Sequence, residues 1–176
     1  MSSRDIRDLC YFTVNEAACL IQKKELSPVE LTQAHLQRID ELDGKIKSFV
    51  ALLSETAMAE ARSCEADILK GDYRGPLHGI PVAHKDQFDA QGLPSRARLD
   101  ADQLQDVIED ATVVRKLKEA GSVFLGKLEM GGWAVGKDAS SQRLQARNPW
   151  DLTRSPGGSS SGSGAALAAG LCMGSL

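Results

Sequence analysis

The sequence predicts an α/β fold in which N-terminal helices lead into the first part of a sheet. Residues 1–74 carry helix-start signals and apolar side chains at helical spacing. Residues 75–176 alternate short apolar segments with helical ones, and a helix followed closely by a strand is typical of α/β proteins. The chain has 176 residues, 42% of them hydrophobic and 26% charged, which is enough for one domain with a core.

Two helices are predicted near the N-terminus from their start signals. The sequence Thr13-Val14-Asn15-Glu16 has the form of a capping box, in which a hydroxyl and a carboxylate each bond a free backbone amide. This helix is expected to run to about Lys24. A second capping box, Ser27-Pro28-Val29-Glu30, places proline at the first helical position. The helix that it starts is expected to end at Asp43-Gly44.

A third helix is predicted over residues 54–70 from the spacing of its apolar side chains. One helical face is formed by Ala57, Ala61, Cys64 and Ile68. Gly71 is the expected stop, because glycine tolerates the left-handed conformation that closes many helices.

In the second half of the chain the pattern changes to short strands. Residues 79–85 read as a strand with proline near its start, where proline is tolerated. Residues 90–109 show no clear period and are predicted to be loop. A helix over residues 111–120, capped by Asp110, then leads into a strand over residues 122–125.

Charge and composition argue against several classes of protein. The 21 basic and 24 acidic residues are mixed along the chain, and no basic block indicates direct nucleic-acid binding. No apolar run is long enough to cross a membrane. The charged N-terminus lacks the apolar segment of a signal peptide, so the expected location is the cytoplasm.

The cysteines and histidines show no pattern of a metal site or a disulfide framework. The four cysteines form no CxxC pair, lack zinc-site spacing, and are expected to be free thiols that act as small buried hydrophobic side chains: Cys10, Cys19, Cys64 and Cys172. The histidines are scattered, and no metal-ligand role is expected of His35, His78 or His84. We therefore expect neither a metal nor a cofactor.

The glycine- and serine-rich stretch SPGGSSSGSGAALAAG, residues 155–170, admits three interpretations. A flexible linker does not explain the strong helix-forming residues 165–169 that end at Gly170. A phosphate loop needs lysine and then serine or threonine after its last glycine, but alanines follow Gly164. A dinucleotide fingerprint fails at Leu167, where glycine or alanine is needed.

The third interpretation is catalytic. The stretch offers four hydroxyls in a loop where glycines let the backbone approach a substrate: Ser159, Ser160, Ser161 and Ser163. A serine needs a base, and Lys85, at the end of an apolar strand, is a candidate. The alternatives stay open at this point: a solvated surface lysine at position 85, and serines that only pack the loop or cap the helix. For Lys127 we expect a solvated or structural role.

Three segments resemble the amidase signature family, and they occur in the order of that family. They are GPLHGIPVAHKDQFD, DATVVRKLKEAGSVFLGKLEM and ARNPWDLTRSPGGSSSGSGAALAAG, and the N-terminal helices are similar as well, so that the resemblance covers nearly all of the chain. It implies a mixed sheet covered by helices, and amide hydrolysis through a Ser–cis-Ser–Lys triad. By this resemblance residues 1–176 form an incomplete amidase signature domain, with a helical part (1–74) and the start of the α/β core (75–176).

The resemblance also implies roles for single residues. Lys85 matches the base, and Ser159 matches the bridging serine, whose peptide bond is cis. Gly157, Gly158 and Ser160 match positions that support the loop and allow the substrate to approach. The acyl-accepting serine of the family follows roughly two dozen residues later, beyond Leu176. Ser175 is too close to Ser159 to match it.

These matches and mismatches lead to the functional expectations. The chain looks like the N-terminal part of an amidase that lacks its nucleophile and is inactive alone. Two alternatives are a non-catalytic fragment that binds a ligand or partner, and the transamidating A subunit of a tRNA-dependent amidotransferase. Expected partners are a small amide substrate for a completed domain and a protein that covers the apolar residues Ala166, Leu167, Leu171 and Met173. Ser161 departs from the glycine usual in the family, and LEMGGWAVG departs from its Asn-Met-x-Glu-Phe pattern.

Overall fold

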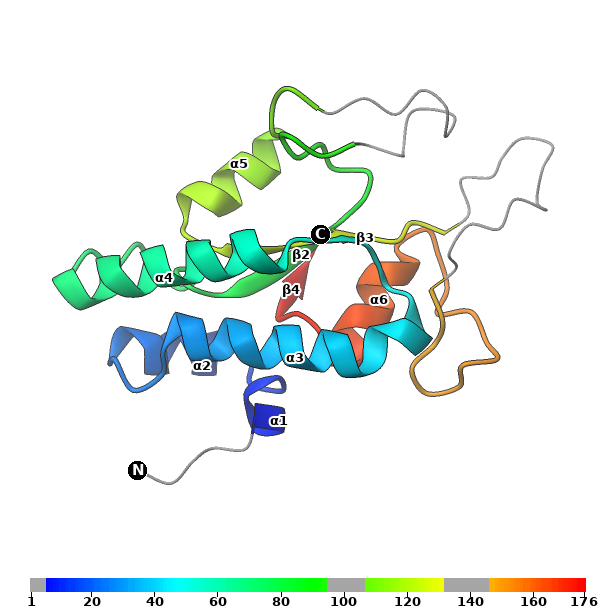
Figure 1. The fold of residues 1–176 in the computed structure, drawn as a ribbon, viewed down its shortest axis with the longest axis horizontal. Helices are drawn as coiled ribbons and strands as arrows, with labels where there is room; N and C mark the ends of the chain where they lie inside the picture. Colours follow the sequence, from blue (N-terminus) through cyan, green and yellow to red (C-terminus); the bar gives the residue numbers. More distant parts are fainter. Residues whose placement is uncertain (1–5, 95–106, 132–145) are drawn as a thin grey trace.

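The computed structural model describes residues 6–94, 107–131 and 146–176. Six helices and four strands follow one another in these residues (Figure 1): α1 Ile6–Leu9, α2 Val14–Gln22, α3 Pro28–Ile46, β1 Phe49–Leu52, α4 Ser54–Lys70, β2 Pro81–Lys85, α5 Thr112–Glu119, β3 Val123–Leu128, α6 Ser161–Ala168 and β4 Gly174–Ser175. No helix in the described part of the chain is both long enough and apolar enough to cross a membrane.

The first two predicted helix starts are present. Thr13 and Glu16 form the predicted capping box of α2, with the amide of Glu16 donating to Thr13 Oγ1 (3.2 Å). Ser27 caps α3 by accepting from the amides of Val29 and Glu30. The predicted end of α3 at Asp43-Gly44 is wrong, because the helix continues to Ile46. The Asp43 carboxylate instead accepts from the amides of residues 48 and 49 and ties the helix end to β1.

Helix α4 has the predicted bounds and the predicted buried face. It follows β1, a strand of four residues that the sequence did not reveal. This strand pairs antiparallel with β3, so the N-terminal part of the chain contributes to the sheet as well as to the helices. Gly126 of β3 makes this pairing possible: a Cβ there would lie 2.1 Å from the carbonyl oxygen of Ala51.

The strands form a mixed sheet in the order β1-β3-β2-β4, in which β2 runs parallel to both β3 and β4. The main core lies where α3, α4 and α6 meet the strands. Val114 of α5 packs with Phe124 of β3 in a separate cluster, and Figure 1 shows α5 on the opposite side of the strands from α3 and α6. The predicted α/β fold with N-terminal helices and a mixed sheet is therefore confirmed.

The predicted cap of α5 is wrong. Ala111, not Asp110, stands at the N-cap, and no side chain caps the helix. Asp110 is engaged elsewhere, because its carboxylate accepts from the amide of Gln91 (2.8 Å) and pairs with Lys118 (2.8 Å). The loop predicted over residues 90–109 is described only at its ends, and residues 95–106 lie outside the described part.

Two expectations about apolar side chains need correction. Of the residues expected to form an exposed patch, Ala166 and Leu171 are fully buried in the main core, because α6 packs onto the sheet. Leu167 is 44% exposed and Met173 is partly buried. Three of the four free cysteines are buried as expected, but Cys19 is exposed on α2.

Candidate active site

The structure brings Lys85 and Ser159 into contact, although 74 positions separate them in the sequence. Lys85 is the last residue of β2, a strand whose five residues are all buried. Lys85 itself is only 6% exposed. Its backbone amide bonds the carbonyl of Leu176 (3.0 Å) and so extends the pairing of β2 with β4. Its Nζ donates a hydrogen bond to Ser159 Oγ at 2.7 Å. A buried amine therefore directly contacts a hydroxyl.

Ser159 lies in the loop before α6, and three predicted loop residues surround it. The Gly158–Ser159 peptide bond is cis, as the resemblance implies, and Gly157 has a φ of 95°, which favours glycine. Ser160 is exposed and occupies the N-cap position of α6, but its side chain makes no capping hydrogen bond. Helix capping, one of the alternative roles considered for the serines of this stretch, is therefore not performed by the Ser160 side chain.

A buried ion pair lies next to Lys85. Asp86 pairs with Lys127 at 2.7 Å, and both side chains are almost completely buried. Lys127 Nζ also donates to the carbonyl oxygen of Pro94 (3.0 Å), which ties the segment after β2 to β3. Lys127 is thus structural and not solvated. Because Asp86 is paired with Lys127, Lys85 has the Ser159 hydroxyl as its side-chain partner among the described residues.

The sequence did not identify a second polar cluster beside this contact. Ser161 is buried, and its Oγ accepts from the amide of Gly131 (2.7 Å) while donating to Glu129 Oε2. Glu129, also buried, follows directly after β3. The sequence contained only an indirect indication of this cluster, because Ser161 and Glu129 both lie in stretches that depart from the pattern of the resembled family. Only the fold shows that the two side chains are in contact.

The hydroxyl of Ser175 points to another residue. It donates to Ser163 Oγ (2.9 Å) and to the carbonyl oxygen of Leu176 (3.2 Å). The contacts of the Ser175 hydroxyl within the described residues do not include Lys85 or Ser159.

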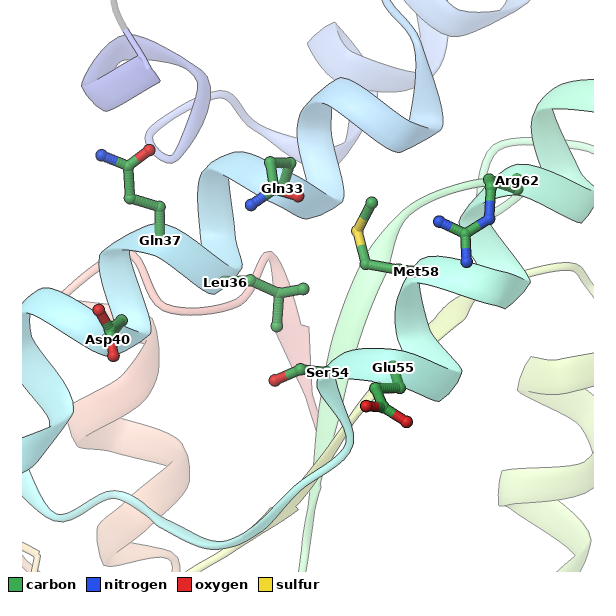
Figure 2. Close-up of a pocket in the computed structure, with 8 residues that line it drawn as sticks. All are labelled: Gln33, Leu36, Gln37, Asp40, Ser54, Glu55, Met58 and Arg62. Atoms are coloured by element: carbon green, nitrogen blue, oxygen red, sulfur yellow. The ribbon is translucent and has the colours of Figure 1, made fainter.

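A cavity of about 750 Å³ between α3 and α4 is lined by other residues. Leu36 of α3 and Met58 of α4 point into the space between the two helices (Figure 2). The polar side chains around them are Gln33, Gln37, Asp40, Ser54, Glu55 and Arg62. Because neither Lys85 nor Ser159 lines this cavity, we place the candidate site at the Lys–Ser contact and not here.

The Lys–Ser contact suits proton transfer. A hydroxyl that accepts from an amine can in turn donate its own proton or receive another, and thus can connect the amine to a third group. Glycines beside Ser159 leave space for the backbone of the loop to approach a substrate. The arrangement can therefore supply a base and a relay for nucleophilic catalysis.

The chain is similar in sequence and fold to known proteins. The A subunit of glutamyl-tRNA(Gln) amidotransferase from Moorella thermoacetica is 43% identical over 166 residues, which cover 93% of this chain and 34% of that protein. The solved structure of native peptide amidase from Stenotrophomonas maltophilia is 38% identical with a TM-score of 0.82, over 92% of this chain and 35% of that one. Fatty acid amide hydrolase, 23% identical, shares the fold with a TM-score of 0.88, over 97% of this chain and 30% of that one.

The chain thus spans about a third of the length of these relatives. The family model described as Amidase matches residues 30–176 and so includes both Lys85 and Ser159. By this match the chain belongs to the amidase family.

Proposed function

We propose that residues 1–176 form the part of an amidase-signature enzyme that carries the base, Lys85, and the bridging serine, Ser159. The reaction is cleavage of a carboxylic amide C–N bond. The observation that carries the proposal is the 2.7 Å contact between the buried Lys85 Nζ and Ser159 Oγ, in a chain of the amidase family. Gly157 and Gly158 leave room for the substrate. Ser160 supports the loop through its backbone, because its carbonyl oxygen accepts from the amide of Gly164 (3.0 Å) and its side chain makes no capping hydrogen bond.

The proton movements follow from this contact. An acyl-accepting serine attacks the amide carbonyl carbon and gives its proton to Ser159 Oγ, while Ser159 gives its own proton to Lys85 Nζ, which acts as the base. When the C–N bond breaks, the proton returns through Ser159 to the leaving nitrogen. Water, or ammonia in an amide transfer, then attacks the acyl carbon and is deprotonated by the same route. The C–O bond to the acyl-accepting serine breaks, and the proton returns through Ser159 to that serine oxygen.

We propose that the acyl-accepting serine lies outside residues 1–176. Ser175 supports this, because its hydroxyl is turned to Ser163 and not to the Lys–Ser contact. Residues 1–176 alone should then hydrolyse activated esters and aryl amides no faster than their Lys85→Met variant. Turnover by the native fragment that the Lys85→Met variant lacks would show that a serine within these residues is the nucleophile.

Two refinements of the function are supported by different relatives. The 43% identity to the A subunit of an amidotransferase favours amide transfer, with partner subunits and a supply of ammonia. The 38% identity to a peptide amidase favours hydrolysis by one chain. Binding without catalysis is the remaining alternative. It predicts that a completed domain is inactive, or that its activity does not depend on Lys85.

A chimera tests the proposal. Residues 1–176 replace the corresponding part of the Stenotrophomonas maltophilia peptide amidase, whose remaining part supplies the rest of the domain. We expect Lys85→Met and Ser159→Ala each to lower kcat on a peptide amide by on the order of a thousandfold or more, as for triad members elsewhere. Ser160→Ala is the matched control. A folded Lys85→Met chimera with near-native kcat would contradict the assignment of the base.

A further inference from the structure

The segment that follows β3 lies along the loop that carries Ser159. Gly131 forms an isolated antiparallel bridge with Ser159. The amide of Gly162 donates to the carbonyl oxygen of Glu129 at 2.9 Å. Both ends of the stretch 159–162 are therefore held against residues 129–131 by the backbone.

A side-chain link between these two backbone contacts joins the same segments. Ser161 Oγ accepts from the amide of Gly131 (2.7 Å) and donates to Glu129 Oε2, and both side chains are buried. The same carboxylate oxygen accepts from the amide of Ala146 at 3.4 Å. The space is tight, because a Cβ at Gly131 would lie 2.7 Å from Ser161 Oγ.

The sheet connects this side-chain link to the Lys85–Ser159 contact. Lys85 stands opposite Leu128 in the parallel pairing of β2 and β3, and Glu129 follows Leu128 directly. The base and the cluster that holds the loop of Ser159 are thus fixed to the same strand pair. A shift of residues 159–162 relative to Glu129 is therefore also a shift of Ser159 Oγ relative to Lys85 Nζ.

We infer that Glu129 and Ser161 are positioning residues that hold Ser159 in reach of Lys85. The Glu129 carboxylate orients the Ser161 hydroxyl, which binds the amide of Gly131 and fixes the loop. Removing that hydroxyl leaves the partly buried N–H of Gly131 without its acceptor. It also leaves the buried Glu129 carboxylate with the amide of Ala146, at 3.4 Å, in place of two donors. Polar groups away from water are costly to leave unpaired. The catalytic meaning of this positioning rests on the proposed function, but the geometry does not.

The test measures the Lys85–Ser159 contact in residues 1–176 and needs no turnover. Trace acetylation with acetic anhydride, quantified by mass spectrometry, gives the labelling rate of Lys85 relative to the exposed Lys70. We expect Ser159→Ala to raise this ratio, because Nζ loses its partner. We expect Ser161→Ala to raise it about fivefold, the equivalent of one hydrogen bond. Ser160→Ala should leave it unchanged.

Conservative variants separate positioning from general loosening. Glu129→Gln keeps an oxygen that accepts from Ser161, so the Lys85 ratio should stay close to the native one. Glu129→Leu should raise the ratio as Ser161→Ala does. If Ser161→Ala does not fold, Ser161→Cys, which keeps a weaker donor and acceptor at this position in a slightly larger side chain, should give an intermediate ratio.

The inference is overturned if Ser159→Ala raises the labelling of Lys85 while folded Ser161→Ala or Ser161→Cys keeps the native ratio. In the chimera, Ser161→Ala should lower kcat and retain KM, because the relay acts on the chemical step. If the ratio rises in Ser161→Ala but Lys85→Met retains kcat, the positioning holds and the proposed function fails. The two failures therefore give different results.

Discussion

Acid should destabilise this protein through its buried histidines. All three, His35, His78 and His84, are buried, and burial lowers the pKa of each. For His35 and His84 the pKa falls from 6.5 to about 4. Arg38 further lowers the pKa of His35, whose Nδ1 lies 2.9 Å from the carbonyl oxygen of Leu31. The His84 ring stacks on the ring of Phe124, with the ring centroids 5.0 Å apart.

The sign and size of the effect follow from these pKa values. Below 6.5 an unfolded histidine binds a proton that the folded protein excludes until about pH 4, so the free energy of unfolding falls as the pH falls through this range. When the pH falls from about 8 to about 5, a histidine whose pKa is lowered to about 4 reduces the free energy of unfolding by about 2 kcal/mol. His35 and His84 together reduce it by about 4 kcal/mol. His78 adds to the loss in the same direction.

Urea unfolding followed by far-ultraviolet circular dichroism measures this loss at the two pH values. Replacing His84 with phenylalanine, which keeps a ring to stack on Phe124, should remove about half of the pH dependence calculated for the two histidines. A free energy of unfolding that stays constant between about pH 8 and about pH 5 would refute the reasoning, because then no buried histidine resists protonation.

Four substitutions test the packing and the ion pair beside the site. Gly126→Ala should prevent the β1–β3 pairing and lower the melting temperature strongly, because its Cβ would lie 2.1 Å from the carbonyl oxygen of Ala51. Gly164→Ala is the matched control: nothing lies within 4 Å of its Cβ, and in helix α6 it should stabilise by about 0.5–1 kcal/mol. Lys127→Met should cost about 3–5 kcal/mol in urea unfolding by leaving Asp86 buried without its partner. The double variant Lys127→Met/Asp86→Leu should recover part of that loss, and equal losses in the single and double variants would contradict the ion-pair argument.

Local signals made helices α2, α3 and α4 predictable. The capping residues Thr13 and Ser27 and the spaced face of α4 each act within one or two turns, so the sequence alone reveals them. Strand β1 gave no such signal, because its four residues are ordered by pairing with β3, far away in the sequence. The cap of α5 was mispredicted for the same reason: Asp110 is recruited by Lys118 and Gln91 in the folded chain.

The site was predictable in part. The motifs around Lys85 and Ser159 carry the resemblance, and the fold brings these two residues within 2.7 Å of one another. The link between Glu129 and Ser161 was not predictable, because nothing in a single sequence indicates which residue either side chain will contact. The burial of Lys127 was missed as well, since a lysine near a strand end is usually solvated and only the position of Asp86 shows otherwise.

A double-mutant cycle on kcat in the chimera tests the central claim, that Lys85 and Ser159 act as one proton relay. Residues that work as a unit lose their effect together, so Lys85→Met/Ser159→Ala should lower kcat by no more than the more damaging single variant does. Ser160→Ala is the control and should leave kcat unchanged, both alone and in combination with Lys85→Met. Losses from Lys85→Met and Ser159→Ala that multiply in the double variant would show that the two residues act independently, and would contradict the relay despite the 2.7 Å contact between them.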